Sequence, residues 1–97
     1  MTPAEADVLA ERARQREQWG DAHDDGHIDG ALADAASLLC NTGWTGVDDE
    51  PSELPAGPGG AFQLRYRHDR RRQLVIGAAF AIAEIDRLDR AAAREKP

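Results

Sequence analysis

Residues 69–93 read DRRRQLVIGAAFAIAEIDRLDRAAA, and no other part of the chain constrains its architecture as strongly. Apolar side chains recur at helical spacing throughout this stretch, which predicts one long helix. Between Leu74 and Ala83 the expected helix is apolar on nearly every side, so it requires burial all round. Its main stripe is expected to contain Leu74, Ala78, Ala81, Ile82, Ile85 and Leu88, and its other sides carry Val75, Ile76, Ala79, Phe80 and Ala83.

Two shorter helices are expected before it. Thr2, Pro3 and Glu5 have the spacing of a capping box with proline in the first turn, which predicts a helix over 3–19 that ends at Gly20. A second helix is predicted over 25–41. Its apolar face would carry Ile28, Leu32, Ala35, Ala36 and Leu39.

The segment between the second and third helices is rich in glycine and proline. Such a composition predicts a long loop over 43–68, with one short strand possible at residues 62–66. The expected fold is therefore all-α. It is a single domain over 1–97, a three-helix bundle with room for a short extra helix and a long Gly/Pro-rich loop between helices 2 and 3.

Burial of the third helix is the main difficulty for a single copy of this chain. Two short neighbours with thin apolar stripes cannot cover a helix that is apolar all round, which favours a homodimer across residues 69–93. The alternative is that the 43–68 loop folds back as the missing cover.

Cellular location is inferred from cysteine usage and from hydropathy. Cys40 is the single cysteine, which excludes an intramolecular disulfide and suits a reducing compartment. The first residues carry charges where a signal peptide needs an apolar run, and no segment reaches the length of a membrane span. We expect a cytoplasmic protein in the host cell with no membrane association.

Charge is strongly segregated along the chain, whose formal net charge is −6. Residues 21–64 contain no lysine or arginine. Nucleic acid is not expected as a partner, because this acidic stretch would repel phosphate. A basic protein surface is a better partner for the acidic stretch. The alternative explanation of the acidic residues is that they only keep the protein soluble. The acidic residues are Asp21, Asp24, Asp25, Asp29, Asp34, Asp48, Asp49, Glu50 and Glu53, and we predict that they form the interaction surface.

The segment His23-Asp24-Asp25-Gly26-His27 supports two main interpretations. The favoured one is local: Asp24 or Asp25 caps the second helix, and the histidines bond nearby groups. The alternative is a Zn²⁺ or Mn²⁺ site with His23, Asp24, Asp25 and His27 as ligands, which could serve a metal-dependent nucleotide phosphohydrolase. No catalytic residue is assigned, and a non-enzymatic role is favoured while the enzyme alternative stays open.

A basic cluster, Arg65, Arg67, Arg70, Arg71 and Arg72, follows the acidic stretch. Guanidinium groups bind phosphate in a bidentate manner, so a nucleotide-binding protein is a further alternative. We favour ion pairs with acidic residues of the same chain or of a partner. Farther along the third helix, Glu84 is expected to pair with Arg87.

Three parts of the sequence, ERARQREQWG, HDDGHIDGALADAA and DRRRQLVIGAAFAIAEIDRLDR, resemble a group of small proteins encoded by phages and prophages. The resemblance covers both ends of the chain and leaves the central loop uncovered. It implies a phage accessory protein and no particular activity. With the acidic stretch, it leads us to expect a counter-defence inhibitor of the anti-CRISPR kind, which occupies the nucleic-acid-binding groove of a host protein such as a CRISPR effector subunit.

A fainter resemblance is to the all-α nucleotide pyrophosphohydrolases of the MazG type, which also end in an alanine-rich dimerising segment. That family binds Mg²⁺ through pairs of acidic residues three positions apart. Here residues 30–34 read GALAD, and Glu84 is followed three positions later by Arg87. The departure counts against the hydrolase, because Mg²⁺ requires several oxygen ligands.

Overall fold

The computed structural model describes residues 1–40 and 69–95 of the chain. These residues form four α-helices: α1 (Pro3–Gln18), α2 (Gly20–Asp25), α3 (Ala31–Cys40) and α5 (Arg70–Glu95). The described ranges contain no strand, so the expected all-α class is confirmed for them. The 43–68 loop, including the short strand considered at residues 62–66, lies outside the described residues. None of the described helices is long and apolar enough to cross a membrane.

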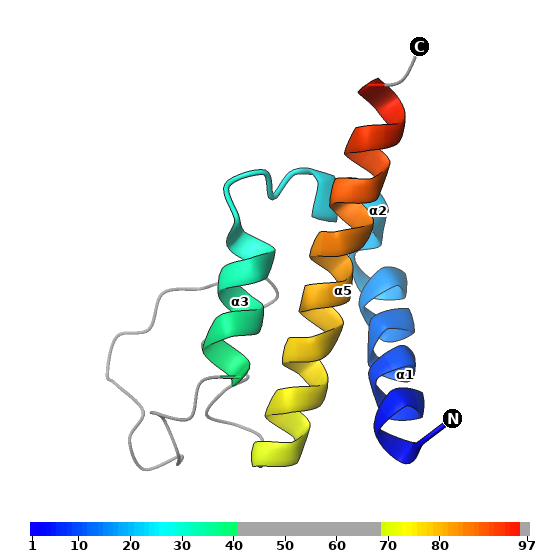
Figure 1. The fold of residues 1–97 in the computed structure, drawn as a ribbon, viewed down its shortest axis with the longest axis vertical. Helices are drawn as coiled ribbons and strands as arrows, with labels where there is room; N and C mark the ends of the chain where they lie inside the picture. Colours follow the sequence, from blue (N-terminus) through cyan, green and yellow to red (C-terminus); the bar gives the residue numbers. More distant parts are fainter. Residues whose placement is uncertain (41–68, 96–97) are drawn as a thin grey trace.

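Helix α5 is the central element of the fold (Figure 1). It runs the length of the molecule, with α3 along one side and α1 along the other, while the short α2 lies beside its C-terminal half. Most interhelix contacts join α5 to α3 and to α1. The long apolar helix is therefore the element against which every other described helix packs.

The core lies between α3 and α5. Leu32 and Leu39 of α3 meet Ile76 and Phe80 of α5, all of them buried, and the Trp19 ring stacks against Phe80 with 6.2 Å between centroids. Close approach of the two helices depends on Gly77. A Cβ atom there would lie 2.8 Å from Cys40 Sγ, closer than real Cβ atoms come to other atoms, and 3.1 Å from Leu39 Cβ, which is tighter than most real contacts.

The predicted start and end of the first helix are confirmed. The Glu5 backbone N–H donates to Thr2 Oγ1 at 3.1 Å, and the Thr2 N–H donates to the Glu5 carboxylate at 2.9 Å, so the capping box is complete. The capping hydrogen bonds lower the Glu5 pKa. At the other end Trp19 is the C-cap, and Gly20 follows with a φ of +77°, a conformation that glycine adopts without strain.

The predicted second helix over 25–41 is wrong at its start. Residues 20–25 form the separate helix α2, and α3 begins at Ala31, where the Asp29 carboxylate accepts the Ala31 N–H at 3.2 Å. Asp24 and Asp25 end α2 and do not cap α3, because their carboxylates bond to arginines. Ile28, expected on the apolar face, lies between the helices and is exposed.

The third helix agrees with its predicted bounds within two residues, but its stripes are exchanged. Val75, Ile76, Ala79, Phe80 and Ala83 form the buried face of α5. The expected main stripe faces outward instead, with Leu74, Ile85 and Leu88 exposed by 40%, 57% and 51%. The buried face is chosen by contact with α1 and α3, which the periodicity of one helix does not reveal. Homodimerisation through α5 stays a prediction.

Candidate functional site

A buried ion pair joins α1 to α2. Arg12 Nη2 donates to Asp24 Oδ2 at 3.2 Å, and each side chain is only 5% exposed. The same nitrogen lies 3.4 Å from Asp86 Oδ2 on α5, so one guanidinium connects three helices. Arg12 Nε is buried and has no hydrogen-bond partner among the described residues. Asp24 therefore has a structural role in this arrangement.

Glu11 is a second buried charge, next to the first on α1. Its carboxylate accepts hydrogen bonds from Arg14 Nη2 and from Arg72 Nη2, each at 2.6 Å. Burial alone would raise the Glu11 pKa, but the hydrogen bonds and charges of the two arginines outweigh that effect and lower it. Glu11 therefore stays ionised and ties the start of α5 to α1.

Asp25 and Asp21 of α2 pair with the C-terminal half of α5. Arg90 Nη2 donates to Asp25 Oδ1 at 2.9 Å, Arg94 lies 3.4 Å from Asp25 Oδ2, and Arg90 also lies 3.5 Å from Asp21. The hydrogen bond from Arg90, followed by the charges of both arginines, lowers the Asp25 pKa. Three of the acidic residues predicted to contact a partner, Asp21, Asp24 and Asp25, thus have arginine partners within the chain.

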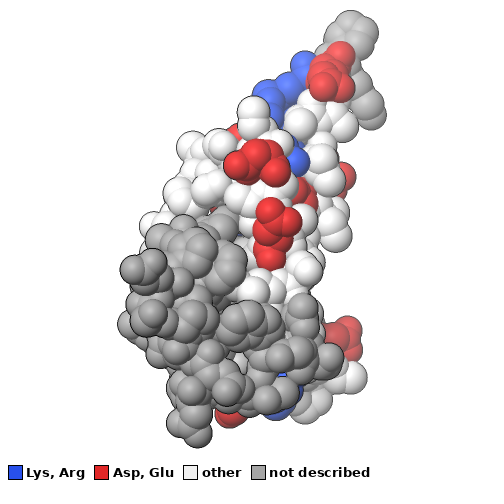
Figure 2. Space-filling model, turned by 90° about the vertical axis from the view of Figure 1, so that its left-hand side faces the viewer, with Lys and Arg blue, Asp and Glu red and all other residues white. Residues whose placement is uncertain are grey.

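Asp29 and Asp34 differ from those three. Both are exposed, and neither forms an ion pair within the described ranges 1–40 and 69–95. Figure 2 shows the side of the molecule that carries α3, where carboxylates lie between the grey segment and the arginines near the C-terminal end of α5. Among the described residues, Asp29 and Asp34 are therefore exposed negative charges without an arginine partner. The remaining predicted acidic residues, Asp48, Asp49, Glu50 and Glu53, lie outside the described residues.

The two histidines of the HDDGH segment lie together. His23 Nε2 and His27 Nε2 are 3.5 Å apart, and the Trp19 ring stacks on His23 with centroids 5.7 Å apart. On its other side His23 Nδ1 is 3.6 Å from Asp24 Oδ1. The described residues contain no group of three or more histidine, cysteine or acidic side chains arranged around a common point. Of the two acidic residues, Asp24 lies beside His23 through Oδ1 while its Oδ2 bonds to Arg12, and Asp25 pairs with Arg90.

Among the described residues, Arg70, Arg71 and Arg72 of the arginine cluster contact groups of the same chain, as favoured, and the carboxylates that pair with Arg71 and Arg72 belong to α1. Arg71 lies 2.8 Å from Asp7, Arg72 bonds to Glu11, and Arg70 donates to the backbone carbonyl groups of Leu39 and Cys40. These contacts clamp the start of α5 to α1 and to the end of α3. Arg65 and Arg67 lie outside the described residues. On α5, Arg87 pairs with Glu84 as expected.

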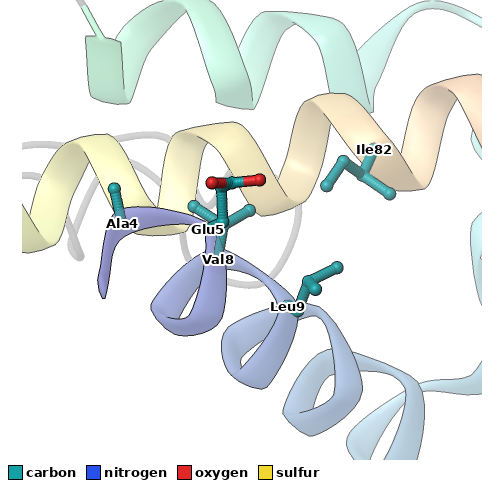
Figure 3. Close-up of a pocket in the computed structure, with 5 residues that line it drawn as sticks. All are labelled: Ala4, Glu5, Val8, Leu9 and Ile82. Atoms are coloured by element: carbon teal, nitrogen blue, oxygen red, sulfur yellow. The ribbon is translucent and has the colours of Figure 1, made fainter. Parts of the chain in front are cut away.

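An apolar surface runs along α5 and α1. Ala4, Val8 and Leu9 of α1 and Ile82 of α5 line a shallow hollow between the helices, and Glu5 lies at its side (Figure 3). A second hollow continues from it toward the start of α5 and is lined by Ala4, Val8, Cys40, Arg71, Leu74, Val75 and Ala78. The two hollows share Ala4 and Val8, so they form one continuous apolar strip between α1 and α5.

The buried polar residues of α1 are the feature that sequence reasoning missed. Glu11 pairs with Arg14 one turn along α1, and yet Glu11, Arg12 and Gln15 are all buried. The available signal was their common helical face, together with the complementary charges of Arg72 and Asp86 on the long helix. Charged residues are rarely buried without partners, and these partners are distant in the sequence.

Comparison with family models, curated proteins and solved structures found no match to this chain.

Proposed function

We propose that this chain is a small acidic interaction protein that binds a basic surface of another protein. The target would be a nucleic-acid-binding groove of a host protein, such as a CRISPR effector subunit, and the chain would act there as a counter-defence inhibitor in the host cytoplasm. Carboxylates would occupy positions meant for phosphate, and complementary charge would speed the encounter.

The observation that carries the proposal is the distribution of ion pairs. The arginines of α1 and α5 are largely neutralised by Asp7, Glu11, Asp21, Asp25 and other carboxylates of the chain. Asp29 and Asp34 have no such partner in the described part of the chain. The unpaired charge that the described residues present on and next to α3 is therefore negative, which favours a basic partner over a phosphate ligand.

The test uses capture from a bacterial lysate that contains a CRISPR effector. We expect the chain to retain a basic protein in stoichiometric amount, and both added salt and added nucleic acid to release it, because exposed charges are screened over about 10 Å at 0.1 M salt. Replacing Asp34→Lys together with Asp29→Asn should slow association with the captured protein about ten-fold. Asparagine at position 29 keeps the acceptor for the Ala31 N–H.

A matched control changes the same amount of charge elsewhere. Glu17→Lys with Asp89→Asn alters two exposed carboxylates on α1 and α5 that lack ion pairs within residues 1–40 and 69–95. This variant should bind as the parent does. Equal binding by both double variants would contradict mimicry through the α3 side. A further variant extends the test to the central segment by changing four acidic residues to lysine: Asp48, Asp49, Glu50 and Glu53.

Metal binding is a second candidate, favoured by the geometry of the histidine pair. Ligand nitrogens of a tetrahedral zinc site lie about 3.3 Å apart, given Zn–N bonds of roughly 2.0–2.1 Å, and the two Nε2 atoms are 3.5 Å apart. Asp24, close to His23 Nδ1, could orient the ring as outer-shell carboxylates do. The pair would supply two of the ligands, and water or another molecule would supply the rest.

Calorimetric titration with Zn²⁺ and with Mn²⁺ tests the metal candidate. We expect one Zn²⁺ per chain, bound much more tightly than Mn²⁺ because nitrogen ligands suit zinc better. His27→Gln should weaken Zn²⁺ binding at least ten-fold, while His68→Gln serves as the control. Unchanged zinc affinity in His27→Gln would exclude the pair as the site.

A further inference from the structure

The outward face of α5 has a regular pattern that packing among the described helices does not use. Leu74, Ala78, Ala81, Ile85, Leu88 and Ala92 follow one another at alternating steps of four and three residues. This is the spacing of a coiled-coil seam. The large members are exposed by 40–57%, and Ala92 is also exposed. The seam lies opposite Ile76 and Phe80, which pack on α3.

We propose that this seam binds the same seam of a second copy of the chain, with the two α5 helices antiparallel. The inference does not depend on the acidic α3 side, so either proposal can fail without the other. It specifies one register, in which Leu74 of one chain faces the partner's Ala92 and each later residue of one helix faces an earlier residue of the other. The centre of symmetry then lies at the level of Ala83.

Side-chain size is complementary in every apolar layer of that register. Leu74 faces the partner's Ala92, Leu88 faces the partner's Ala78, and Ile85 faces the partner's Ala81. Each large side chain thus meets an alanine, and symmetry repeats the three layers on the other half. Alternating large and small residues let two helices approach closely and fill the space between them.

Charge is complementary at the ends of the seam. When the same spacing is continued by one position at each end, Arg71 precedes Leu74 and Glu95 follows Ala92. In the antiparallel register Arg71 faces the partner's Glu95. Arg71 is 61% exposed while paired with Asp7, so it can accept a second carboxylate at its outer side. Opposite charges at both ends favour this register.

Other arrangements of the same two helices are less favourable. A parallel pair would place Ala78 against the partner's Ala78 and Ala81 against the partner's Ala81, which leaves two consecutive layers underfilled. It would also place Arg71 opposite the partner's Arg71 and repel at that end. An antiparallel shift by seven residues again creates an alanine–alanine layer.

The hollow between α1 and α5 extends the proposed interface. Ile82 flanks the seam near the centre of symmetry, next to Leu9 of α1, so the two copies of Ile82 would meet across the axis. Glu84 flanks the other side, and its charge is neutralised by Arg87. The centre of the interface would therefore be apolar with little net repulsion.

Sedimentation of the full chain tests the interface. We expect a dimer at micromolar concentration and a dissociation constant roughly 100-fold weaker for Leu88→Asp, because the two symmetry-related layers that pair position 88 with Ala78 would each receive a charge. The matched control is Ile28→Asp, the same kind of change at an exposed apolar residue between α2 and α3. Circular dichroism should show both variants as helical as the parent. A monomeric parent would overturn the proposal, as would equal dimerisation by the two variants.

Disulfide trapping tests the orientation in a Cys40→Ser background. Mixing Ala78→Cys with Leu88→Cys should give a cross-linked heterodimer, because these positions face each other only in the antiparallel register. Ala78→Cys alone should stay uncross-linked. Efficient cross-linking of Ala78→Cys with itself would show a parallel pair, and a dimer without the mixed cross-link would show a different register or surface; either result would overturn the proposal.

Discussion

Replacing Arg12 by alanine is expected to lower the free energy of unfolding by about 3–5 kcal/mol, as removal of one partner from a buried ion pair does. Arg12 and Asp24 are each 5% exposed, so the variant would leave the Asp24 carboxylate in a site shielded from water. It would also remove the contact with Asp86 that ties α1 to α5. Urea denaturation followed by circular dichroism measures the change.

Two further variants separate this effect from a general loss of charge. Arg16→Ala removes an exposed arginine from pairs with Asp21 and Asp86 and should cost no more than about 1 kcal/mol. The double variant Arg12→Leu with Asp24→Leu should recover most of the lost stability, because no unpaired charge remains buried. Equal losses for Arg12→Ala and Arg16→Ala would show that burial of the pair contributes nothing.

Phe80→Ala is expected to destabilise the chain by about 3–5 kcal/mol, the usual cost of removing a buried phenylalanine. Phe80 is 2% exposed, packs among residues of α3 and stacks with Trp19, so its loss would leave a cavity where α3, α5 and the end of α1 meet. Thermal and urea unfolding should both shift. Trp19 fluorescence should change as well, since the ring loses its neighbour.

The control for the Phe80 variant is Ile28→Ala. Ile28 is 77% exposed, so its truncation removes little buried surface and should change stability by about 0.5 kcal/mol or less. A small effect at Phe80 would contradict the assignment of the α3-facing side of α5 as the core.

Local sequence signals predicted the ends of helices well where the capping groups are neighbours in the sequence. Thr2 and Glu5 lie three residues apart, so their capping box forms within one turn and depends on nothing distant. Gly20 likewise ends α1 through its own backbone conformation. The second helix was misjudged because Asp24 and Asp25 resemble capping residues, although their actual partners are the distant arginines Arg12 and Arg90.

The histidine pair was also predicted only in part, because sequence spacing identifies neighbours within a turn but not the distant partners of the acidic residues. His23 and His27 are four residues apart, and local geometry brings them together as the spacing suggested. Asp24 and Asp25 belong to the same short segment, yet a tertiary ion pair with Arg90 engages Asp25, and Asp24 divides its carboxylate between His23 and the distant Arg12. Spacing along the chain can identify neighbours within a turn, but competition from distant charges decides which of them bond.

The sequence by itself determined that the described part of the chain is helical, that residues 69–93 contain its longest helix, and that lysine and arginine are absent from residues 21–64. These properties follow from composition and from periodicity within single segments. Tertiary structure alone decided which side of α5 is buried, because both sides are apolar and the choice depends on the shapes of α1 and α3. It also decided that Glu11 and Arg12 are buried, since a charge enters the interior only where the fold brings an opposite charge to meet it.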